Sequence, residues 1–238
     1  MRYYIVWFFY HVAYWLVRIA LFPVYSIRFE GRENRPKTKS AIFASNHRSY
    51  LDPVLVAMAA PHPFNYIAKE SLFKTPGFSH LIRFMGAFPA SSSTDPNYDM
   101  LAEATRRLKN KRYMTIFPEG TRHTDGKVGK GKTGMCVLSA KSGMPIVPVG
   151  IIFDSNNLHF RSRICVRMGK PFYPEDYGIT PDSNPLQMKQ MKDDVMASIK
   201  SMVEENPPFE IIHDEPKHKS SREKAREARD KEKAAKEN

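Results

Sequence analysis

The chain has 238 residues, of which 42% are hydrophobic and 12% aromatic, enough for one well-filled core but not for two full domains. No collagen-like or solenoid period occurs, which excludes those repeat architectures. The formal net charge of +12 indicates an anionic partner, such as nucleic acid, an acidic carrier protein or anionic lipid head groups. Cys136 and Cys165 lie in apolar stretches, which predicts buried thiols and no disulfide framework.

The N-terminal segment is apolar and aromatic. A membrane-spanning helix needs about 20 consecutive apolar residues, whereas the run from Tyr3 to Val17 is shorter and is followed by Arg18 and Pro23. Trp, Tyr and Arg favour the head-group level of a bilayer. We therefore expect residues 1–28 to form a membrane-associating helical segment that lies in the interface. A buried core helix is the alternative.

Residues 29–213 have the pattern of one α/β domain. Apolar, β-branched runs predict strands at 41–45, 114–117, 145–153 and 163–169, and helical patterns predict helices at 53–60, 98–109, 135–142 and 186–205. Strands that alternate with helices indicate a mixed sheet flanked by helices, with functional residues in loops at the strand ends.

A histidine and an aspartate follow the first of these predicted strands. In SNHRSYLD, residues 45–52, His47 lies at the strand exit, and Asp52 precedes Pro53 as the expected N-cap of a helix. Asp52 could reach back to Nδ1 of His47 and leave Nε2 able to accept a proton. The nucleophile activated by such a base would be a hydroxyl group of the substrate. The alternative is a helix cap beside an ordinary loop histidine.

A second polar segment, IFPEGTRH at residues 116–123, follows the predicted strand at 114–117. An arginine at a strand exit, here Arg122, could bind a phosphate with two hydrogen bonds. Backbone N–H groups near Gly120 could stabilise an oxyanion. Taken alone, the segment would also fit a turn with a surface ion pair.

Together the two segments resemble the motifs of the glycerolipid acyltransferases related to bacterial 1-acylglycerol-3-phosphate acyltransferase. NHRSYLD is similar to the NHxxxxD box of that family and FPEGTR to its second signature, and similar stretches lie at 68–78, 86–91 and 146–151. The resemblance implies the α/β fold of that family and an enzyme that moves an acyl group from acyl-CoA or acyl carrier protein to lysophosphatidic acid. It implies no cofactor.

The resemblance also implies roles for single residues. His47 and Asp52 would be catalytic, with His47 as the general base. The substrate-binding residues would be Asn46, Lys69, Glu119, Gly120, Thr121 and Arg122. The family box around Gly86 often ends in arginine, but residues 90–93 here are Ala-Ser-Ser-Ser. Among the remaining basic residues we favour Arg122 and Lys69 for the acceptor phosphate.

Two other functions compete with this interpretation. GKVGKGKT, residues 126–133, matches the GxxxxGK[ST] pattern of a nucleotide-binding P-loop, although PEGTRHTD separates it from the preceding predicted strand. A nucleic-acid-binding module would account for the net charge, but no reader motif occurs, and we expect no nucleic-acid partner. No metal site is expected either, because the histidines show neither HExxH nor a zinc-finger spacing.

The C-terminal residues 214–238 alternate charged residues with alanine and offer no apolar stripe, which predicts a disordered or solvated helical tail. An acceptor in the bilayer and a donor in the cytosol predict a peripheral or monotopic protein on the cytoplasmic face of the cell membrane. The sequence leaves the acyl chain length, the donor and the oligomeric state open.

Overall fold

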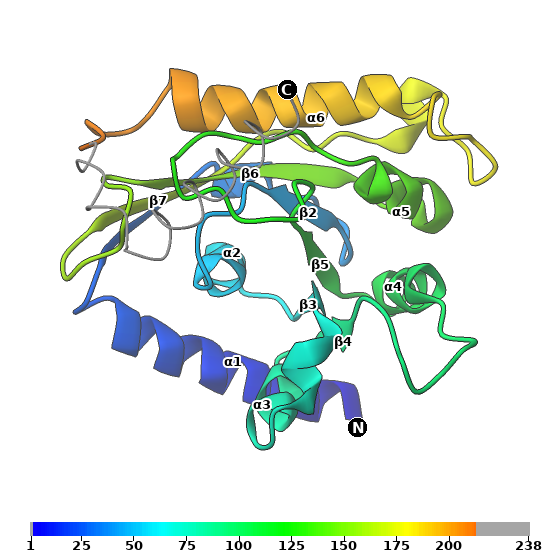
Figure 1. The fold of residues 1–238 in the computed structure, drawn as a ribbon, viewed down its shortest axis with the longest axis horizontal. Coiled ribbons are helices and arrows are strands. Elements are labelled where there is room, and N and C mark those ends of the chain that lie inside the picture. The colour runs from blue at the N-terminus through cyan, green and yellow to red at the C-terminus, as the bar shows by residue number, and fades with distance from the viewer. Residues whose placement is uncertain (1, 213–238) are drawn as a thin grey trace, which may run out of the picture.

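The computed structural model describes residues 2–212, with side chains described from residue 8 onward, so the predicted tail at 214–238 lies outside the described residues. A seven-stranded sheet with the order β1-β7-β6-β2-β5-β3-β4 forms the centre (Figure 1). Its strands are β1 (Ser26–Glu30), β2 (Ile42–Ser45), β3 (Phe64–Ala68), β4 (Ala87–Pro89), β5 (Tyr113–Ile116), β6 (Ile146–Phe153) and β7 (Arg163–Met168). The predicted α/β class with a mixed sheet is confirmed.

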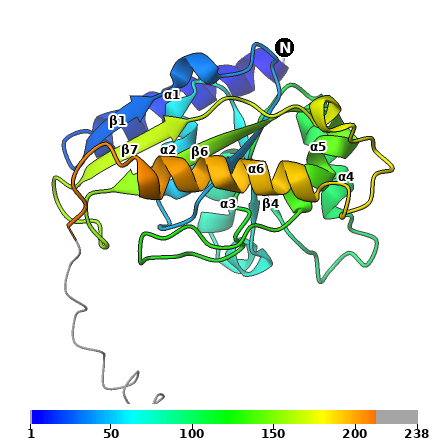
Figure 2. The same cartoon turned by 90° about the horizontal axis from the view of Figure 1, so that it is seen from above.

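Helices cover both faces of the sheet. They are α1 (Arg2–Leu21), α2 (Asp52–Ala59), α3 (Phe78–Phe84), α4 (Met100–Lys109), α5 (Gly134–Ser142) and α6 (Lys189–Lys200), which a π-helical turn (Ser201–Glu205) continues. Residues of α1 and α2 pack into one core cluster, and residues of α4, α5 and α6 pack into the other. Figures 1 and 2 accordingly show α1 and α6 on opposite sides of the sheet.

Five neighbouring strands of the sheet, β6, β2, β5, β3 and β4, run parallel, whereas β7 is antiparallel to β6. The carboxyl ends of parallel strands meet at one edge of a sheet, where loops gather side chains from distant parts of the chain. Ala44 of β2 is paired with Ile116 of β5. The loop that carries His47 therefore starts beside the loop that carries Glu119.

The central strand β2 is buried on both faces, as a run of apolar residues predicts for a covered parallel sheet. Its Phe43 ring lies 5.0 Å from the ring of Phe64 and 4.8 Å from that of Tyr113, measured between centroids. Burying one such side chain stabilises the fold by roughly 1.5–3 kcal/mol. Core packing therefore holds β2 in place, and β2 leads directly into the loop that carries His47.

The predicted strands correspond to β2, β5, β6 and β7, and the predicted helices to α2, α4, α5 and α6. The helix predicted from residue 186 begins only at Lys189, because Asn184 accepts hydrogen bonds from the N–H groups of Leu186 and Gln187 in a preceding turn. Three strands, β1, β3 and β4, and helix α3 were not predicted. They are short, and β1 carries charged Arg28 and Glu30 at the edge of the sheet.

The N-terminal segment forms the 20-residue helix α1. None of the described helices combines the length and the hydropathy needed to cross a bilayer. One side of α1 packs on the core through Tyr10, Tyr14, Val17 and Leu21. Its exposed apolar side chains are Phe8, Phe9, Val12, Trp15, Leu16 and Ile19. The boundary expected at residue 28 falls inside β1, which pairs with β7.

Candidate active site

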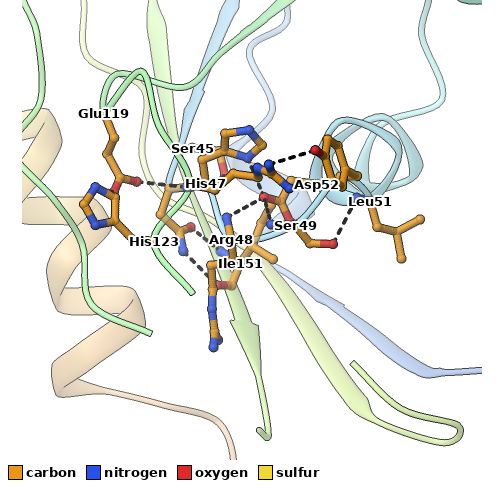
Figure 3. Close-up of polar contacts among 12 residues, drawn as sticks. Ser45, His47, Arg48, Ser49, Leu51, Asp52, Glu119, His123 and Ile151 are labelled. Carbon is orange, nitrogen blue, oxygen red and sulfur yellow. Dashed lines mark hydrogen bonds and ion pairs between the residues drawn. The ribbon is translucent and has the colours of Figure 1, made fainter. Parts of the chain in front are cut away.

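The imidazole of His47 and the carboxylate of Asp52 are in contact at the carboxyl edge of the sheet. Nδ1 of His47 lies 2.7 Å from Oδ2 of Asp52, and the two side chains are 19% and 0% exposed (Figure 3). A carboxylate at Nδ1 favours the tautomer that holds its proton there. Nε2 has no hydrogen-bond partner among the described residues, so its lone pair is available to accept a proton.

Asp52 has a different place from the N-cap that the sequence predicts. Leu51 occupies the N-cap position, and Asp52 is the first residue of α2, followed by Pro53. Its Oδ2 atom also accepts the N–H groups of Arg48 at 2.6 Å and Ser49 at 2.7 Å. The carboxylate therefore turns back into the loop and organises the backbone beside His47, and the nearby helix N-terminus favours its negative charge.

Glu119 joins three segments of the site. Its Oε1 atom accepts the N–H of His47 at 2.9 Å, and its Oε2 atom accepts the N–H of Gly129 at 2.8 Å. Nε2 of His123 lies 3.4 Å from Oε2, and the N–H of His123 donates to the carbonyl oxygen of His47 at 2.7 Å (Figure 3). Because the side chain is 1% exposed, Glu119 positions the histidine loop from within the protein.

Phe117 forms the wall behind the histidine. Its ring is stacked on that of His47, with centroids 4.1 Å apart and planes 19° from parallel. Phe117 also lines an apolar cavity of about 170 Å³ between α4 and α5, whose rim includes Gly120 and Lys132. The stacking limits rotation of the imidazole, and Asp52 and Phe117 together fix the direction of Nε2.

The exposed part of the second motif lies farther along the same loop. The guanidinium of Arg122 is stacked 3.6 Å from the ring centroid of Tyr50 and donates to its hydroxyl at 2.9 Å. Gly120 has φ +73°, and its N–H donates to the carbonyl oxygen of Phe117, so this N–H is not available for an oxyanion. The N–H groups of Thr121 and Arg122 have no acceptor within residues 2–212.

The side chains of Asn46 and Lys69 form no hydrogen bond with His47 or Asp52 among the described residues. The amide of Asn46 is 2% exposed; its Oδ1 accepts the N–H of Ile151 at 2.7 Å and its Nδ2 donates to the same residue's carbonyl oxygen at 2.9 Å. Both ends of this side chain are therefore used to join β2 to β6. Lys69 is exposed after β3, and its side chain forms no hydrogen bond or ion pair with any described residue.

Two residues near the site were missed by sequence reasoning. Arg48 is only 5% exposed; its guanidinium lies 4.7 Å from the ring of Phe153 and donates to the carbonyl oxygen of Ser155 at 3.3 Å. Desolvation lowers the pKa of Arg48 below its ordinary value. No sequence signal marks a buried arginine, whereas His123, which directly follows FPEGTR, could have been noticed.

The glycine- and lysine-rich stretch at 126–133 does not form a P-loop. A P-loop follows its strand directly and points converging N–H groups at phosphates, but residues 117–125 separate this stretch from β5. Several of its N–H groups already have protein acceptors: Val128 donates to Glu204, Gly129 to Glu119 and Lys132 to Pro118. The stretch therefore lacks the backbone geometry that a nucleotide-binding P-loop needs.

Comparison with known proteins identifies the family of this chain. The family model described as Acyltransferase matches residues 26–152. The chain is 34% identical over 137 residues to the chloroplastic 1-acyl-sn-glycerol-3-phosphate acyltransferase LPAT1 of Arabidopsis thaliana, which covers 56% of this chain and 38% of that protein. It is 29% identical over 154 residues to the 1-acyl-sn-glycerol-3-phosphate acyltransferase of Borreliella burgdorferi, covering 64% of this chain and 59% of the relative.

A solved structure has the same fold. The crystal structure of the 1-acyl-sn-glycerophosphate (LPA) acyltransferase PlsC from Thermotoga maritima superposes with a TM-score of 0.63 at 27% identity, over 84% of this chain and 77% of that one. The chain thus spans between about two fifths and three fifths of the two curated relatives described above. The matched model covers both motifs and five strands of the sheet, β1, β2, β3, β4 and β5, with most of β6. The chain belongs to the acyltransferase family.

Proposed function

We propose that this chain transfers an acyl group from a thioester, carried by coenzyme A or acyl carrier protein, to the 2-hydroxyl of 1-acylglycerol 3-phosphate, giving phosphatidic acid. The observation that supports this most strongly is the 2.7 Å contact between His47 and Asp52, with Nε2 directed away from the carboxylate. The names of its relatives support the same acceptor.

In the proposed mechanism His47 acts as general base. Nε2 takes the proton of the acceptor hydroxyl as its oxygen forms a bond to the thioester carbon. Asp52 stabilises the imidazolium that results, at 2.7 Å from Nδ1. The tetrahedral oxyanion then collapses, the carbon–sulfur bond breaks, and the imidazolium returns the proton to the departing thiolate. No acyl-enzyme intermediate is needed.

The motif after β5 would bind the charged parts of the reaction. The N–H groups of Thr121 and Arg122 supply two donors for the oxyanion, in place of the Gly120 N–H, which is occupied. The guanidinium of Arg122 keeps donors beyond its bond to Tyr50 and would bind the acceptor phosphate. Lys69 is a second candidate for this phosphate because it is exposed and unpaired among the described residues.

The membrane would lie against α1 and the neighbouring α3. Arg18 lies between the exposed Leu16 and Ile19 of α1, and its guanidinium lies over the ring of Phe22. Leu72, Phe78, Leu81 and Phe84 of the α3 region are exposed as well. An apolar helix face with basic residues favours the lipid head-group region. We therefore propose peripheral or monotopic attachment at the cytoplasmic face of a membrane.

A cavity beneath this surface is suited to a fatty chain. It has a volume of about 290 Å³ and lies between α1, α2 and α3, with a lining that is mostly apolar. Tyr10 and Tyr14 line it from α1, and Val54 and Met58 line it from α2, the helix that begins at Asp52. One acyl chain of the reacting lipids would occupy this space.

A direct assay tests the reaction. The purified chain is incubated with labelled 1-acylglycerol 3-phosphate and either acyl-CoA or acyl carrier protein loaded with the same acyl group, and labelled phosphatidic acid is measured. We expect product with at least one donor and none with the His47→Ala variant. Absence of product with both donors, under conditions where the protein is folded and bound to lipid vesicles, would refute the proposed function.

Vesicle flotation tests the membrane surface separately. Leu16→Glu and Ile19→Glu place charges on the exposed face of α1 without touching the core. We expect both variants to float less with anionic vesicles than the parent. Leu186→Glu is the matched control, since Leu186 is also exposed but precedes α6 on the other side of the sheet. Equal flotation of all four proteins would exclude α1 as the attachment surface.

A further inference from the structure

The segment that connects β5 to α5 carries three lysines that the proposed mechanism does not use. We call residues 121–133 the basic loop. It contains one carboxylate, Asp125, and four exposed cations, Arg122, Lys127, Lys130 and Lys132. Arg122 is engaged with Tyr50, whereas the three lysines form no ion pair with residues 8–212. Three exposed ammonium groups within six residues, with no ion pair to a described carboxylate, favour an anionic ligand.

The backbone of the basic loop is fixed at several points beside the catalytic pair. The N–H of His123 donates to the carbonyl oxygen of His47 at 2.7 Å, and the N–H of Gly129 donates to Glu119 at 2.8 Å. On the other side, Val128 donates to Glu204 at 2.7 Å. The loop is thus held by hydrogen bonds although it contains no helix or strand.

Close packing on α6 adds a further anchor. A Cβ atom added to Gly131 would lie 2.4 Å from Sδ of Met196, so the loop backbone packs closely on this side chain of α6. The loop, drawn in green, passes near α6 before it enters α5 (Figure 2). Lys130 and Lys132 flank this contact, and the N–H of Lys132 donates to the carbonyl oxygen of Pro118 at 2.9 Å.

The exposed lysine side chains of the loop can bind an anion. The N–H groups of Val128, Gly129 and Lys132 already donate to protein oxygens, so these three are not available to a phosphate. Lysine ammonium groups bind phosphate oxygens well through charge-assisted hydrogen bonds. Nζ of Lys132 lies 3.0 Å from the Cβ position of Gly120, the residue after Glu119, which places this lysine beside the reacting edge.

The position of the loop indicates which substrate it meets. It packs on α6, and α6 covers the face of the sheet opposite α1 and its exposed apolar side chains (Figures 1 and 2). A surface on that side faces away from the proposed membrane. The loop therefore lies on the side from which a water-soluble substrate would approach.

We propose that Lys127, Lys130 and Lys132 of the basic loop bind the phosphate of the donor's pantetheine arm. Acyl-CoA and acyl carrier protein have this phosphate in common, joined through pantetheine to the thioester that reacts. The inference rests on the proposed acyl transfer and adds a site for its donor. The acceptor phosphate is left to Arg122, which is turned toward Tyr50.

Donor analogues test this site. The double variant Lys127→Ala/Lys130→Ala is compared with the parent, using acyl-4′-phosphopantetheine and acyl-pantetheine, which lacks the phosphate. We expect KM for the phosphorylated donor to rise about tenfold, as for two charge-assisted contacts at an exposed site. KM for acyl-pantetheine and for the acceptor should stay unchanged. The rise should shrink at high salt, which screens exposed charges.

The control variant Lys109→Ala/Lys141→Ala removes two exposed lysines from α4 and α5 and should behave as the parent. Acyl-CoA and acyl carrier protein are assayed in parallel. The donor whose KM rises in the loop variant is the source of the phosphate that the lysines bind. A rise confined to the acceptor, or an equal rise with acyl-pantetheine, would overturn the inference. If the parent makes no phosphatidic acid with any donor, the proposed function itself fails; unchanged kinetics in the loop variant alone refute only the donor site.

Discussion

Oδ2 of Asp52 accepts three donors at once: Nδ1 of His47 at 2.7 Å and the N–H groups of Arg48 and Ser49 at 2.6 and 2.7 Å. One buried oxygen therefore sets both the direction of the imidazole and the shape of the loop that carries it. This double role means that a change at Asp52 affects catalysis and local backbone structure together, whereas a change at His47 affects the reacting group alone.

Replacing His47 separates these effects. We expect His47→Ala to lower kcat by about 10²–10⁴-fold, because a positioned general base contributes that much. Stability should change little, since the ring is partly exposed and its loss leaves the N–H groups of Arg48 and Ser49 paired with Asp52. Steady-state kinetics and thermal unfolding measure the two quantities. Retention of the parental kcat would show that another group takes the proton.

Asp52→Asn is the companion variant. Its amide oxygen can still accept the two backbone N–H groups, but it cannot stabilise an imidazolium as a carboxylate does. We expect a loss in kcat of at least about 10²-fold with the circular dichroism spectrum unchanged. A variant that keeps full activity would contradict the proposed support of His47 by Asp52.

Glu119 is expected to act through position. In the parent protein the N–H groups of His47 and Gly129 each meet a carboxylate oxygen of Glu119. In Glu119→Gln one of these two N–H groups faces the NH₂ group of the amide instead. Leaving one buried donor unpaired costs about 1–3 kcal/mol of unfolding free energy. We also expect a lower kcat with an unchanged KM for the acceptor, as measured by denaturant titration and kinetics.

Glu204→Gln is the matched control for this experiment. Glu204 accepts one N–H from the same loop, that of Val128, but through a more exposed side chain. Its amide oxygen can still accept that bond, so stability should stay within about 0.5 kcal/mol of the parent. If both glutamine variants behave alike, Glu119 has no special role in holding His47.

Asn46 is expected to matter for stability. Asn46→Ala leaves the N–H and the carbonyl oxygen of Ile151 without their partners in a buried site. Two unpaired buried groups should lower the free energy of unfolding by about 2–4 kcal/mol, measured by urea denaturation. Asn97→Ala removes an exposed asparagine side chain and should have almost no effect. A small loss for Asn46→Ala would mean that β2 and β6 do not depend on this bridge.

The two buried thiols predict a loss of stability at alkaline pH. Burial raises the pKa of Cys136 from 9.0 to about 12 and that of Cys165 from 9.0 to about 11. Above pH 9 the unfolded chain therefore releases protons that the folded chain retains, and the free energy of unfolding falls as pH rises. The decrease begins near pH 9 and continues to about pH 11–12.

Unfolding free energies of the parent and of Cys136→Ala/Cys165→Ala, measured by urea at several pH values from 8 upward, test this prediction. The variant is expected to be less stable at pH 8 but to lose less stability between pH 8 and 10. The difference between the two slopes isolates the thiols from tyrosines that titrate in the same range. Parallel curves of unfolding free energy against pH for the two proteins would disprove a contribution of the buried thiols to this loss.

The predictable parts of the fold were those with a strong local pattern. The runs that became β2, β5, β6 and β7 are long or continuously apolar. The strand β4 has only three residues, and β1 mixes apolar and charged residues at an edge. Such a strand forms because an adjacent strand of the sheet supplies its hydrogen-bond partners, and that adjacent strand is far away in the sequence.

The amino-acid sequence by itself indicated the covered sheet and the polar loops at its strand ends, and it allowed His47 to pair with Asp52, because the two residues are only five positions apart. Only the tertiary structure decided that Glu119 holds the backbone of His47, that Phe117 stacks on its ring and that Asn46 joins two strands. These contacts arise from the order of strands in the sheet, which brings β2, β5 and β6 side by side; such an order is set by packing of the whole core and not by any one segment.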